Sequence, residues 1–213
     1  PAFAYQVARS TDEAVAILHA HGGDAKLLAG GQSLMPMLNF RLLSPAILVD
    51  INGIAGLDRI ELEGDELHIG ALTRHRQLQT STLAARRLPL LPSLMGHVAH
   101  VAIRNAGTVG GSLSHADPAA ELPLLAQLLD ARFDVTGPQA GREIAASDFF
   151  VAPLQTALRD DEMLTRVRFP LPPQEHRSSF FEVARRRGDF ALAAAGAVLT
   201  LDEEKVTSAR IAL

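Results

Sequence analysis

The first 55 residues alternate between apolar residues at helical spacing and short, continuous apolar runs. Ala14, Ile17 and Leu18 share one helix face, behind a capping box formed by Ser10 and Glu13 and ahead of a glycine pair. The continuous runs have the length of buried strands, so the whole stretch is a β-α-β-α-β pattern that predicts a small parallel sheet. The expected elements are a helix between Ser10 and Gly22, strands over 26–28 and 47–51, and a helix over 34–43.

The next stretch predicts a hairpin followed by helices. Residues 58–72 alternate apolar and polar positions around Gly64-Asp65, as the two strands of an antiparallel hairpin do. Residues 75–97 are mostly helical in pattern, and Pro89 and Pro92 interrupt them. We therefore expect broken helical structure between the hairpin and residue 98.

A further apolar helix is expected over 121–129, with Asp117 as its N-cap and Pro118 at its first position. Helices mixed with hairpins indicate an α+β fold. The remaining strands are expected over 132–136, 163–169, 179–185 and 190–201, with a last hairpin turning at 202–205.

Residues 170–174 hold three prolines and are the expected linker, because proline resists both helix and sheet. They separate a domain over 1–173, with lobes of about 1–55 and 56–173, from the start of a second α+β domain over 174–213. We expect most of this second domain to be missing, since the chain ends inside an apolar strand; a natural short variant is the alternative. The start at Pro1 reads as a mature N-terminus after removal of an initiator Met.

Composition limits the classes of function. The 213 residues are 47% hydrophobic and 21% charged, as in ordinary globular proteins, and fill one large or two small domains. A net charge of −4 argues against a nucleic-acid partner. The basic run 185–187 is flanked by Glu182 and Asp189, so we expect a solvated face or a subunit contact there. No apolar run approaches the ~20 residues that a membrane-spanning helix needs.

Two glycine pairs carry the candidate chemistry. Gly30-Gly31 precedes Gln32-Ser33, and Gly110-Gly111 stands between Thr108 and Ser112. Adjacent glycines permit positive φ and leave successive amides bare, which favours phosphate binding, and two such loops suit a dinucleotide. Each pair has the alternative of an ordinary tight turn, and neither matches a Rossmann or P-loop motif. If the second pair binds phosphate, replacing either of its glycines with Val should abolish binding and leave the fold largely intact.

Three motifs in a common order carry a family resemblance: Ala-Gly-Gly-Gln-Ser-Leu at 29–34, the segment 103–112, and His-Ala-Asp-Pro-Ala at 115–119. Together they resemble the FAD-binding medium subunit of molybdenum hydroxylases, the family of carbon monoxide dehydrogenase and xanthine dehydrogenase. The resemblance implies a two-lobed FAD-binding domain of the PCMH type and a cytoplasmic oxidoreductase subunit with non-covalent FAD. Electrons from a molybdenum cofactor on a large subunit would pass through [2Fe–2S] clusters on a small subunit to this FAD and then to an external acceptor.

The resemblance also implies which residues contact FAD, with no catalytic side chain among them. Glu121 stands where the family commonly has Asp at the N3–H edge of the flavin. The alternative for Asp117 and Glu121 is that these carboxylates only stabilise the start of a helix. Glu182 stands where Lys is frequent, so it either reverses the charge near the flavin or points away. The implied contacts are Leu28, Ala29, Gly30, Gly31, Gln32, Ser33, Leu34, Met35, Thr108, Gly110, Gly111, Ser112, Asp117, Glu121, Leu164 and Glu182.

The absence of cysteine gives the resemblance a consequence. Iron–sulfur clusters are held by Cys thiolates, so a chain without Cys needs a partner to carry them. His97, His100 and His115 show no metal-ligand pattern, and no metal site is expected. Two other functions stay open: a non-catalytic binding or assembly module of the same fold, and a stand-alone flavin oxidase, against which the lack of a covalent flavin-attachment context argues.

Overall fold

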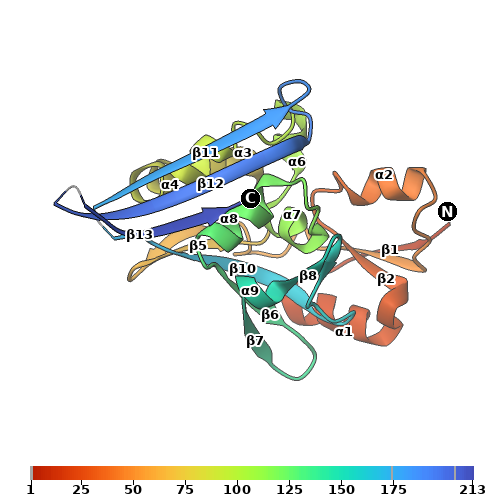
Figure 1. Cartoon of the computed structure of the whole chain (residues 1–213). Helices are drawn as coiled ribbons and strands as arrows, with labels where there is room; N and C mark the ends of the chain where they lie inside the picture. The colour runs from red at the N-terminus through yellow and green to blue at the C-terminus, as the bar shows by residue number, and fades with distance from the viewer. Residues whose placement is uncertain (1, 174, 204) are drawn as a thin grey trace.

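The computed structural model describes residues 2–173, 175–203 and 205–213. The expected start at Pro1, the end of the expected linker at Gln174 and one residue of the expected turn, Glu204, lie outside the described residues. Figure 1 shows three parts: a lobe formed by the N-terminal strands and helices, a central lobe of helices and a sheet, and a C-terminal sheet along one side.

The N-terminal lobe is the predicted parallel sheet. Its strands run in the order β1-β3-β2 and all pair in parallel. Ser10 is the N-cap of the first helix, and its hydroxyl accepts the Glu13 N–H at 3.1 Å. The second helix is shorter than expected and ends at Asn39. The elements are β1 (Ala4–Val7), α1 (Thr11–His21), β2 (Ala25–Leu28), α2 (Leu34–Asn39) and β3 (Ile47–Asp50), with a single 3₁₀ turn at Gly22–Asp24.

The central lobe is built on a five-stranded antiparallel sheet in the order β4-β5-β10-β6-β7. Its strands are β4 (Ile60–Glu63), β5 (Glu66–Gly70), β6 (Arg132–Thr136), β7 (Gly141–Ala145) and β10 (Met163–Pro170). One face of the sheet is buried under short helices, with Phe133 and Phe149 stacked at 3.9 Å between ring centroids in the core. The expected hairpin turns at Gly64, where φ is +57°.

The expected broken helix over 75–97 is three short helices, α3 (His75–Gln79), α4 (Thr82–Arg87) and α5 (Leu90–Leu94). The placement of Asp117 as an N-cap is wrong, because α8 begins at Glu121 and its N-cap is Ala120. Asp117 instead closes a turn ahead of the helix, where its Oδ1 accepts the Ala119 N–H at 2.9 Å. The other elements of this lobe are α6 (Val101–Ala106), α7 (Val109–His115), α8 (Glu121–Leu128), α9 (Ala146–Phe149), β8 (Phe150–Ala152) and β9 (Gln155–Thr156).

The C-terminal sheet consists of β11 (His176–Ala184), β12 (Ala191–Asp202) and β13 (Lys205–Ala212), paired antiparallel in chain order. It packs on α8 so closely that a Cβ atom at Gly196 would lie 2.7 Å from Leu128 Cδ2. The expected linker overlaps the central sheet, because Pro170 is the last residue of β10 and pairs with Glu66. The division into domains at residue 173 stays a prediction.

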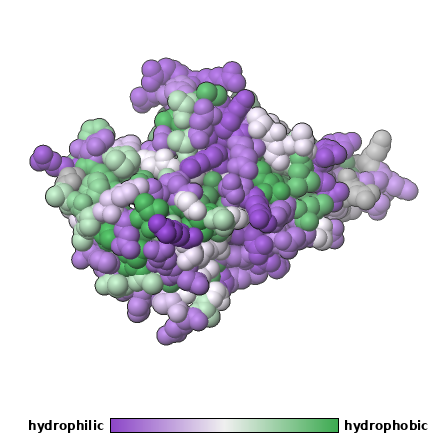
Figure 2. All heavy atoms as spheres, turned by 180° about the vertical axis from the view of Figure 1, so that it is seen from behind, coloured by the Kyte–Doolittle hydropathy of each residue, from purple (hydrophilic) through white to green (hydrophobic). Residues whose placement is uncertain are grey.

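The surface is mixed, and large apolar side chains are exposed both on the N-terminal lobe and on the C-terminal sheet, where Phe181 and Ile211 are exposed. Figure 2, seen from behind, shows hydrophobic residues at the end of the molecule that the N-terminal lobe occupies and in patches elsewhere. Phe40 of the N-terminal lobe is 77% exposed, and Leu42 and Tyr5 are also exposed. Among the described residues, no helix combines the length and apolar character needed to cross a membrane.

Candidate functional site

The two glycine segments, far apart in sequence, meet where the lobes touch. The loop after β2 runs against the end of α6, and a Cβ atom at Gly30 would lie 2.4 Å from the Ala106 carbonyl oxygen and 2.8 Å from Gly107 Cα. No side chain fits at such distances, so Gly30 allows backbone to approach backbone. The structure therefore brings together the two segments that the sequence singled out.

The first loop presents a row of uncommitted amides. Within the described parts of the chain, the N–H groups of residues 30–34 donate to no backbone or side-chain acceptor. Gly31 has a φ of +69°, and Gln32 Nε2 donates to the Gly30 carbonyl at 2.8 Å, which holds the loop in its bend. Successive bare amides form a concavity that binds anions. The loop thus fits the pyrophosphate of a dinucleotide.

The second glycine pair has its amides in use. Thr108 is the N-cap of α7, and its Oγ1 accepts the Gly111 N–H at 3.1 Å. The Val109 and Gly110 N–H groups donate at 2.9 and 2.8 Å to carbonyls of residues 71–73. Neither glycine has a positive φ, because both are helical. Protein acceptors therefore already take these three donors, and a second phosphate-binding loop stays a prediction.

Close packing explains why glycine stands at 110. A Cβ atom there would lie 2.5 Å from Ala71 Cβ and 2.8 Å from the Ala71 backbone. The expectation that Gly110→Val leaves the fold intact is therefore wrong. Gly111 is exposed, and a Cβ atom there would approach only Thr108 Oγ1, at 2.8 Å. Ser112 lies half-buried in α7, and its N–H donates to the Thr108 carbonyl within the helix.

His75, at the start of α3, binds two backbone carbonyls of the second segment. Its backbone N–H donates to the Gly107 carbonyl at 3.0 Å, and its Nε2 lies 3.0 Å from the Thr108 carbonyl oxygen. Burial lowers the pKa of His75 to about 4, so the ring is neutral near pH 7. A carbonyl only accepts, which assigns the single ring proton to Nε2. The buried Nδ1 has no partner within the described residues.

A group of carboxylates lies beyond the other end of α7. Glu121 is only 8% exposed, and its burial raises the pKa of that carboxyl to about 7, with the charges of Glu182 and Asp117 adding to the effect. Glu182 Oε2 is buried and finds no hydrogen-bond partner among the described residues. The structure thus brings these three carboxylates together, and Glu182 points inward rather than away, although Asp117 stands outside the helix.

Leu164, which the resemblance implied as a contact of FAD, is buried in the main core. Its side chain is 4% exposed and belongs to the main core, opposite Val135 in the sheet. The implied contact with FAD, through the backbone or the side chain of Leu164, stays a prediction. Met35, at the start of α2, is by contrast 39% exposed beside the first loop.

Two residues that the sequence analysis missed join the glycine segments. Asn52 Nδ2 donates to the Ala29 carbonyl at 2.9 Å, and Arg74 donates both to Asn52 Oδ1 at 2.7 Å and to the Ala106 carbonyl at 2.6 Å. The available signal was the position of Asn52 just after the carboxyl end of a parallel strand, where ligand-facing polar residues gather. Nothing in the sequence near Arg74 indicates its partners.

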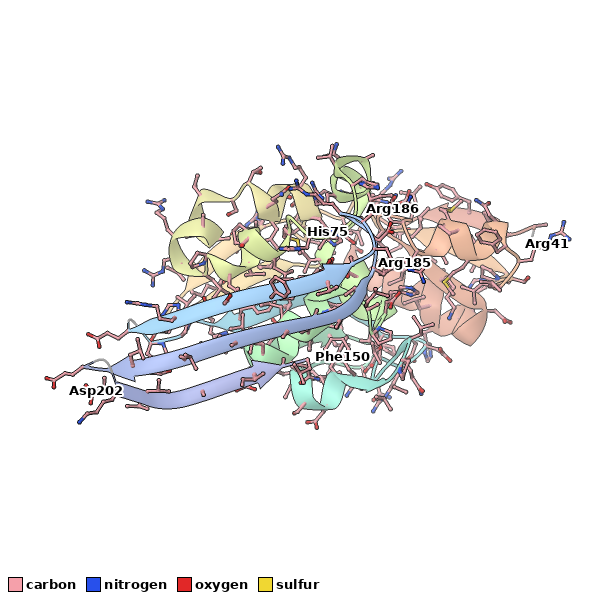
Figure 3. All side chains as sticks on the ribbon, turned by 45° about the horizontal axis from the view of Figure 1, so that its top comes forward. Arg41, His75, Phe150, Arg185, Arg186 and Asp202 are labelled. Atoms are coloured by element: carbon pink, nitrogen blue, oxygen red, sulfur yellow. The ribbon has the colours of Figure 1, made fainter. Side chains whose placement is uncertain are left out.

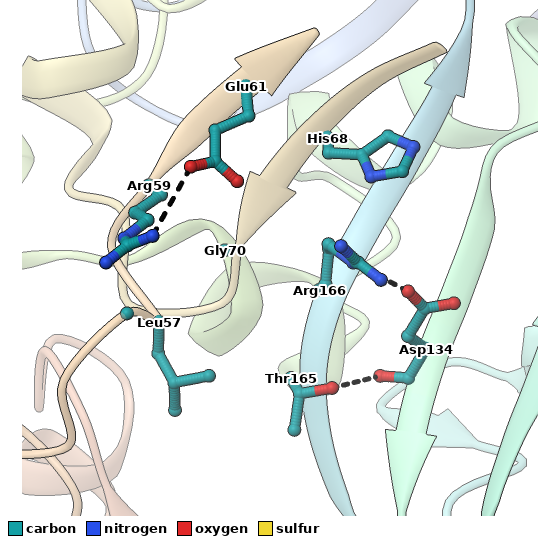
Figure 4. Close-up of a pocket in the computed structure, with 9 residues that line it drawn as sticks. Leu57, Arg59, Glu61, His68, Gly70, Asp134, Thr165 and Arg166 are labelled. Atoms are coloured by element: carbon teal, nitrogen blue, oxygen red, sulfur yellow. Dashed lines mark hydrogen bonds and ion pairs between the residues drawn. The ribbon is translucent and has the colours of Figure 1, made fainter. Parts of the chain in front are cut away.

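A separate hollow of about 210 Å³ lies on the face of the central sheet opposite the main core. Figure 4 shows Arg166 beside Asp134, with its Nε 2.7 Å from Asp134 Oδ2, and Arg59 beside Glu61 at 3.5 Å. Because these charges neutralise one another, the hollow offers no net charge to a ligand.

The basic run 185–187 lies at the turn between β11 and β12. Figure 3 shows Arg185 and Arg186 at the end of the sheet nearer the N-terminal lobe and Asp202 at the opposite end. Arg186 pairs with Asp189 at 3.1 Å, and all three arginines are exposed. This exposure fits both a solvated face and a subunit contact, and the choice between them stays a prediction.

Comparison with known proteins decides the family. Residues 1–172 match the family described as the FAD binding domain in molybdopterin dehydrogenase. This chain belongs to that family. It is 43% identical to the 6-hydroxypseudooxynicotine dehydrogenase complex subunit alpha of Paenarthrobacter nicotinovorans, over 99% of this chain and 72% of the relative. It is 39% identical to the carbon monoxide dehydrogenase medium chain of Afipia carboxidovorans, over 99% of this chain and 73% of that one.

Solved structures agree with this assignment of an FAD-binding oxidoreductase chain. Quinoline 2-oxidoreductase from Pseudomonas putida 86 superposes with a TM-score of 0.95 at 40% identity, over 99% of this chain and 73% of that one. Reconstituted CO dehydrogenase from Oligotropha carboxidovorans superposes with a TM-score of 0.97 at 39% identity, over 99% and 74%. The resemblance and the α+β fold class are confirmed, and FAD is the cofactor of this family.

Proposed function

We propose that this chain is the FAD-carrying electron-transfer subunit of a molybdenum hydroxylase. Electrons reach its FAD from [2Fe–2S] clusters of a small partner subunit, after oxidation of the substrate at the molybdenum cofactor of a large subunit, and leave to an external acceptor. Family membership supports this, as do relatives named as subunits or medium chains of dehydrogenases. With no cysteine of its own, the chain has no thiolate to ligate a cluster. A cytoplasmic location is part of the proposal and is checked by cell fractionation.

The single observation that carries the FAD site is the row of uncommitted amides at residues 30–34. These amides bind the pyrophosphate, and residues 28–35 form the wall on which it lies. The second segment supplies the opposite wall, with Thr108 and Ser112 as the polar side chains near it. Gly30 closes the gap between the walls, because its missing Cβ lets the loop meet Ala106.

The carboxylates mark the other end of the site. α7 has seven residues, so roughly 10 Å of helix separates the loops from the carboxylates at its C-terminal end. Bound FAD supplies the redox chemistry, and the protein supplies binding and electrostatics. Glu121, with a pKa of about 7, is protonated in part of the molecules near neutral pH and then donates a hydrogen bond. Glu182 lies close enough to raise that pKa, which keeps negative charge near this end of the site.

The first test is the flavin content of the purified protein. We expect one FAD for each chain, released into the supernatant on acid precipitation because no covalent bond holds it. Flavin that stays with the protein pellet contradicts non-covalent binding. A folded protein that neither contains nor takes up FAD contradicts the proposed site.

The second test is the composition of the native complex. A pull-down from the source organism should recover an iron–sulfur subunit and a molybdenum subunit, with both metals in the eluate. An FAD protein free of iron and molybdenum, and reduced directly by a small substrate, establishes the stand-alone oxidase instead. A complete complex in which substrate never reduces the flavin establishes the non-catalytic module.

A further inference from the structure

The side chain of Arg74 reaches both lobes at the glycine segments. It stands just before α3, where its Nη1 donates to the Ala106 carbonyl at 2.6 Å and its Nη2 to Asn52 Oδ1 at 2.7 Å. A guanidinium is planar and always charged, so its two donors hold their acceptors at a fixed separation. Arg74 therefore fixes the spacing between Asn52 Oδ1 in one lobe and the Ala106 carbonyl oxygen in the other.

Asn52 extends this connection to the first loop. Its Nδ2 donates to the Ala29 carbonyl at 2.9 Å and to Asp50 Oδ1 at 2.7 Å, while its Oδ1 accepts from Arg74. Asp50 in turn accepts the Tyr5 hydroxyl, which ties the group to β1. A continuous chain of hydrogen bonds thus runs from the residue before Gly30 to the residue before Gly107.

The rest of the contact at this point contributes no hydrogen bond within the described residues. Gly30 and Ala106 meet through van der Waals contact, and the N–H groups of residues 30–34 have no acceptor in the part of the chain that the structure describes. Elsewhere the lobes are joined by apolar packing, with Leu72 and Met163 of the central lobe in the core of the N-terminal lobe. They are also joined by His19 of α1, whose Nδ1 lies 2.9 Å from Asp161 Oδ2, on the far side of the N-terminal sheet from the glycine segments. A hollow of about 240 Å³ lies beside Asn52 and Arg74, so one side of the pair has no packed protein to support it.

We propose that Arg74 and Asn52 form an interlobe clamp, a pair of positioning residues that fixes the spacing of the two glycine segments and so preorganises the amides of residues 30–34 for a pyrophosphate. This inference rests on the proposed placement of FAD at the first loop. Without the clamp, binding must also order the lobes relative to one another, which weakens affinity.

The test compares two arginines of the same segment. Arg74→Met removes the fork and keeps the length of the side chain. Arg76→Met is the matched control, because Arg76 is exposed and its side chain donates to Gln79 Oε1, at 3.0 Å, within the same short helix. We expect the FAD dissociation constant to rise about 10- to 100-fold in Arg74→Met and to stay unchanged in Arg76→Met.

A distance measurement separates positioning from simple destabilisation. The chain has no cysteine, so Ala20→Cys in α1 and Arg87→Cys in α4 accept spin labels at two defined, exposed sites on different lobes. In the FAD-free protein, Arg74→Met should broaden the label-to-label distance distribution, and FAD should narrow it again. A residue that only stabilises its own helix lowers the melting temperature and leaves this distribution unchanged.

Asn52→Leu provides a second way to open the clamp. It should reproduce both effects, and the double variant should bind FAD no more weakly than Arg74→Met, because the two residues act as one unit. If Arg74→Met does not fold, Arg74→Lys, which keeps the charge and loses the fork, should shift both readouts in the same direction. Unchanged affinity and unchanged distances in the folded variants overturn the clamp. A parent chain that does not bind FAD overturns the proposed function instead, and the distances still test the clamp.

Discussion

The two glycine segments have similar sequences and opposite hydrogen-bond arrangements. At the first, the amides of residues 30–34 have no acceptor among the residues that the structure describes. At the second, residues 109–111 donate all of theirs to carbonyls of residues 71–73 and to Thr108. Gly31 is glycine for its positive φ, whereas Gly110 is glycine because Ala71 leaves no room for a Cβ atom. A glycine pair thus indicates close backbone approach, and the hydrogen-bond partners of its amides distinguish a ligand site from a packing contact.

The largest expected effect comes from the packed glycine. Gly110→Val should lower the free energy of unfolding by about 3 kcal/mol or more, because its Cβ would overlap Ala71. Urea denaturation of the FAD-free protein measures this. Gly111→Ala should stay within about 1 kcal/mol of the parent, since only the Thr108 hydroxyl is in the way. A Gly110→Val protein of normal stability that has lost only FAD binding would contradict the packing role of Gly110 and support a phosphate-binding loop at this segment.

The next largest effect is a loss of stability at acid pH, where protonation of His75 disturbs its contacts with the carbonyls of Gly107 and Thr108. The pKa of His75 is about 4 in the folded protein and about 6.5 when unfolded, so its contribution is complete above pH 6.5 and is lost as the pH falls toward 4. The loss should reach up to about 3 kcal/mol. Urea denaturation at pH 7 and pH 4.5 should show this slope in the parent, and His75→Gln should lack that part of it. Equal slopes in the two proteins would contradict a buried, neutral histidine.

Glu121, beyond the C-terminal end of α7, should give a smaller dependence of stability on pH with the opposite sign, because its stability is lost as the pH rises. Glu121 has a pKa of about 7 in the folded protein, above its ordinary 4.5. Its neutral form therefore leaves the free energy of unfolding highest below pH 4.5, and this stability is lost as the pH rises through 7, because the folded protein must then bury a charge. Glu121→Gln should therefore raise the free energy of unfolding by about 1–3 kcal/mol at pH 8 and change it little at pH 4.5. Glu61→Gln is the control, because Glu61 is half-exposed and pairs with Arg59. A Glu121→Gln protein that is less stable at pH 8 would show that the carboxylate is stabilised there by a partner.

The smallest effect concerns the open loop. Gly31→Ala should cost about 1 kcal/mol of stability, because a Cβ atom disfavours a φ of +69°. Gly31→Asn should cost less, since Asn tolerates left-handed backbone better. Thermal unfolding and FAD titration of both variants check this order. If both substitutions leave stability and FAD affinity unchanged, the bend at Gly31 does not shape the site.

Local patterns determined much of this protein. The capping box at Ser10, the parallel strands at 26–28 and 47–51, and the hairpin at Gly64 follow from spacing and turn chemistry within a few residues, and the structure has them all. The motif order also identified the family, because a set of short motifs is specific even where each one is weak. Asp117 shows where such reasoning ends: its sequence is typical of an N-cap, but the helix begins four residues later.

The tertiary structure alone decided what each glycine segment does. The amides of residues 109 and 110 are occupied because the segment after β5 brings the carbonyls of Ala71 and Thr73 to them, a long-range pairing that leaves no local signal. Arg74, Asn52 and Ala106 come from three separate elements, and their hydrogen bonds exist only once the two lobes have packed. The raised pKa of Glu121 likewise depends on burial and on Glu182 from a distant strand. Sequence patterns determine what a segment is able to form, whereas hydrogen-bond partners and burial depend on which distant segments the fold places beside it.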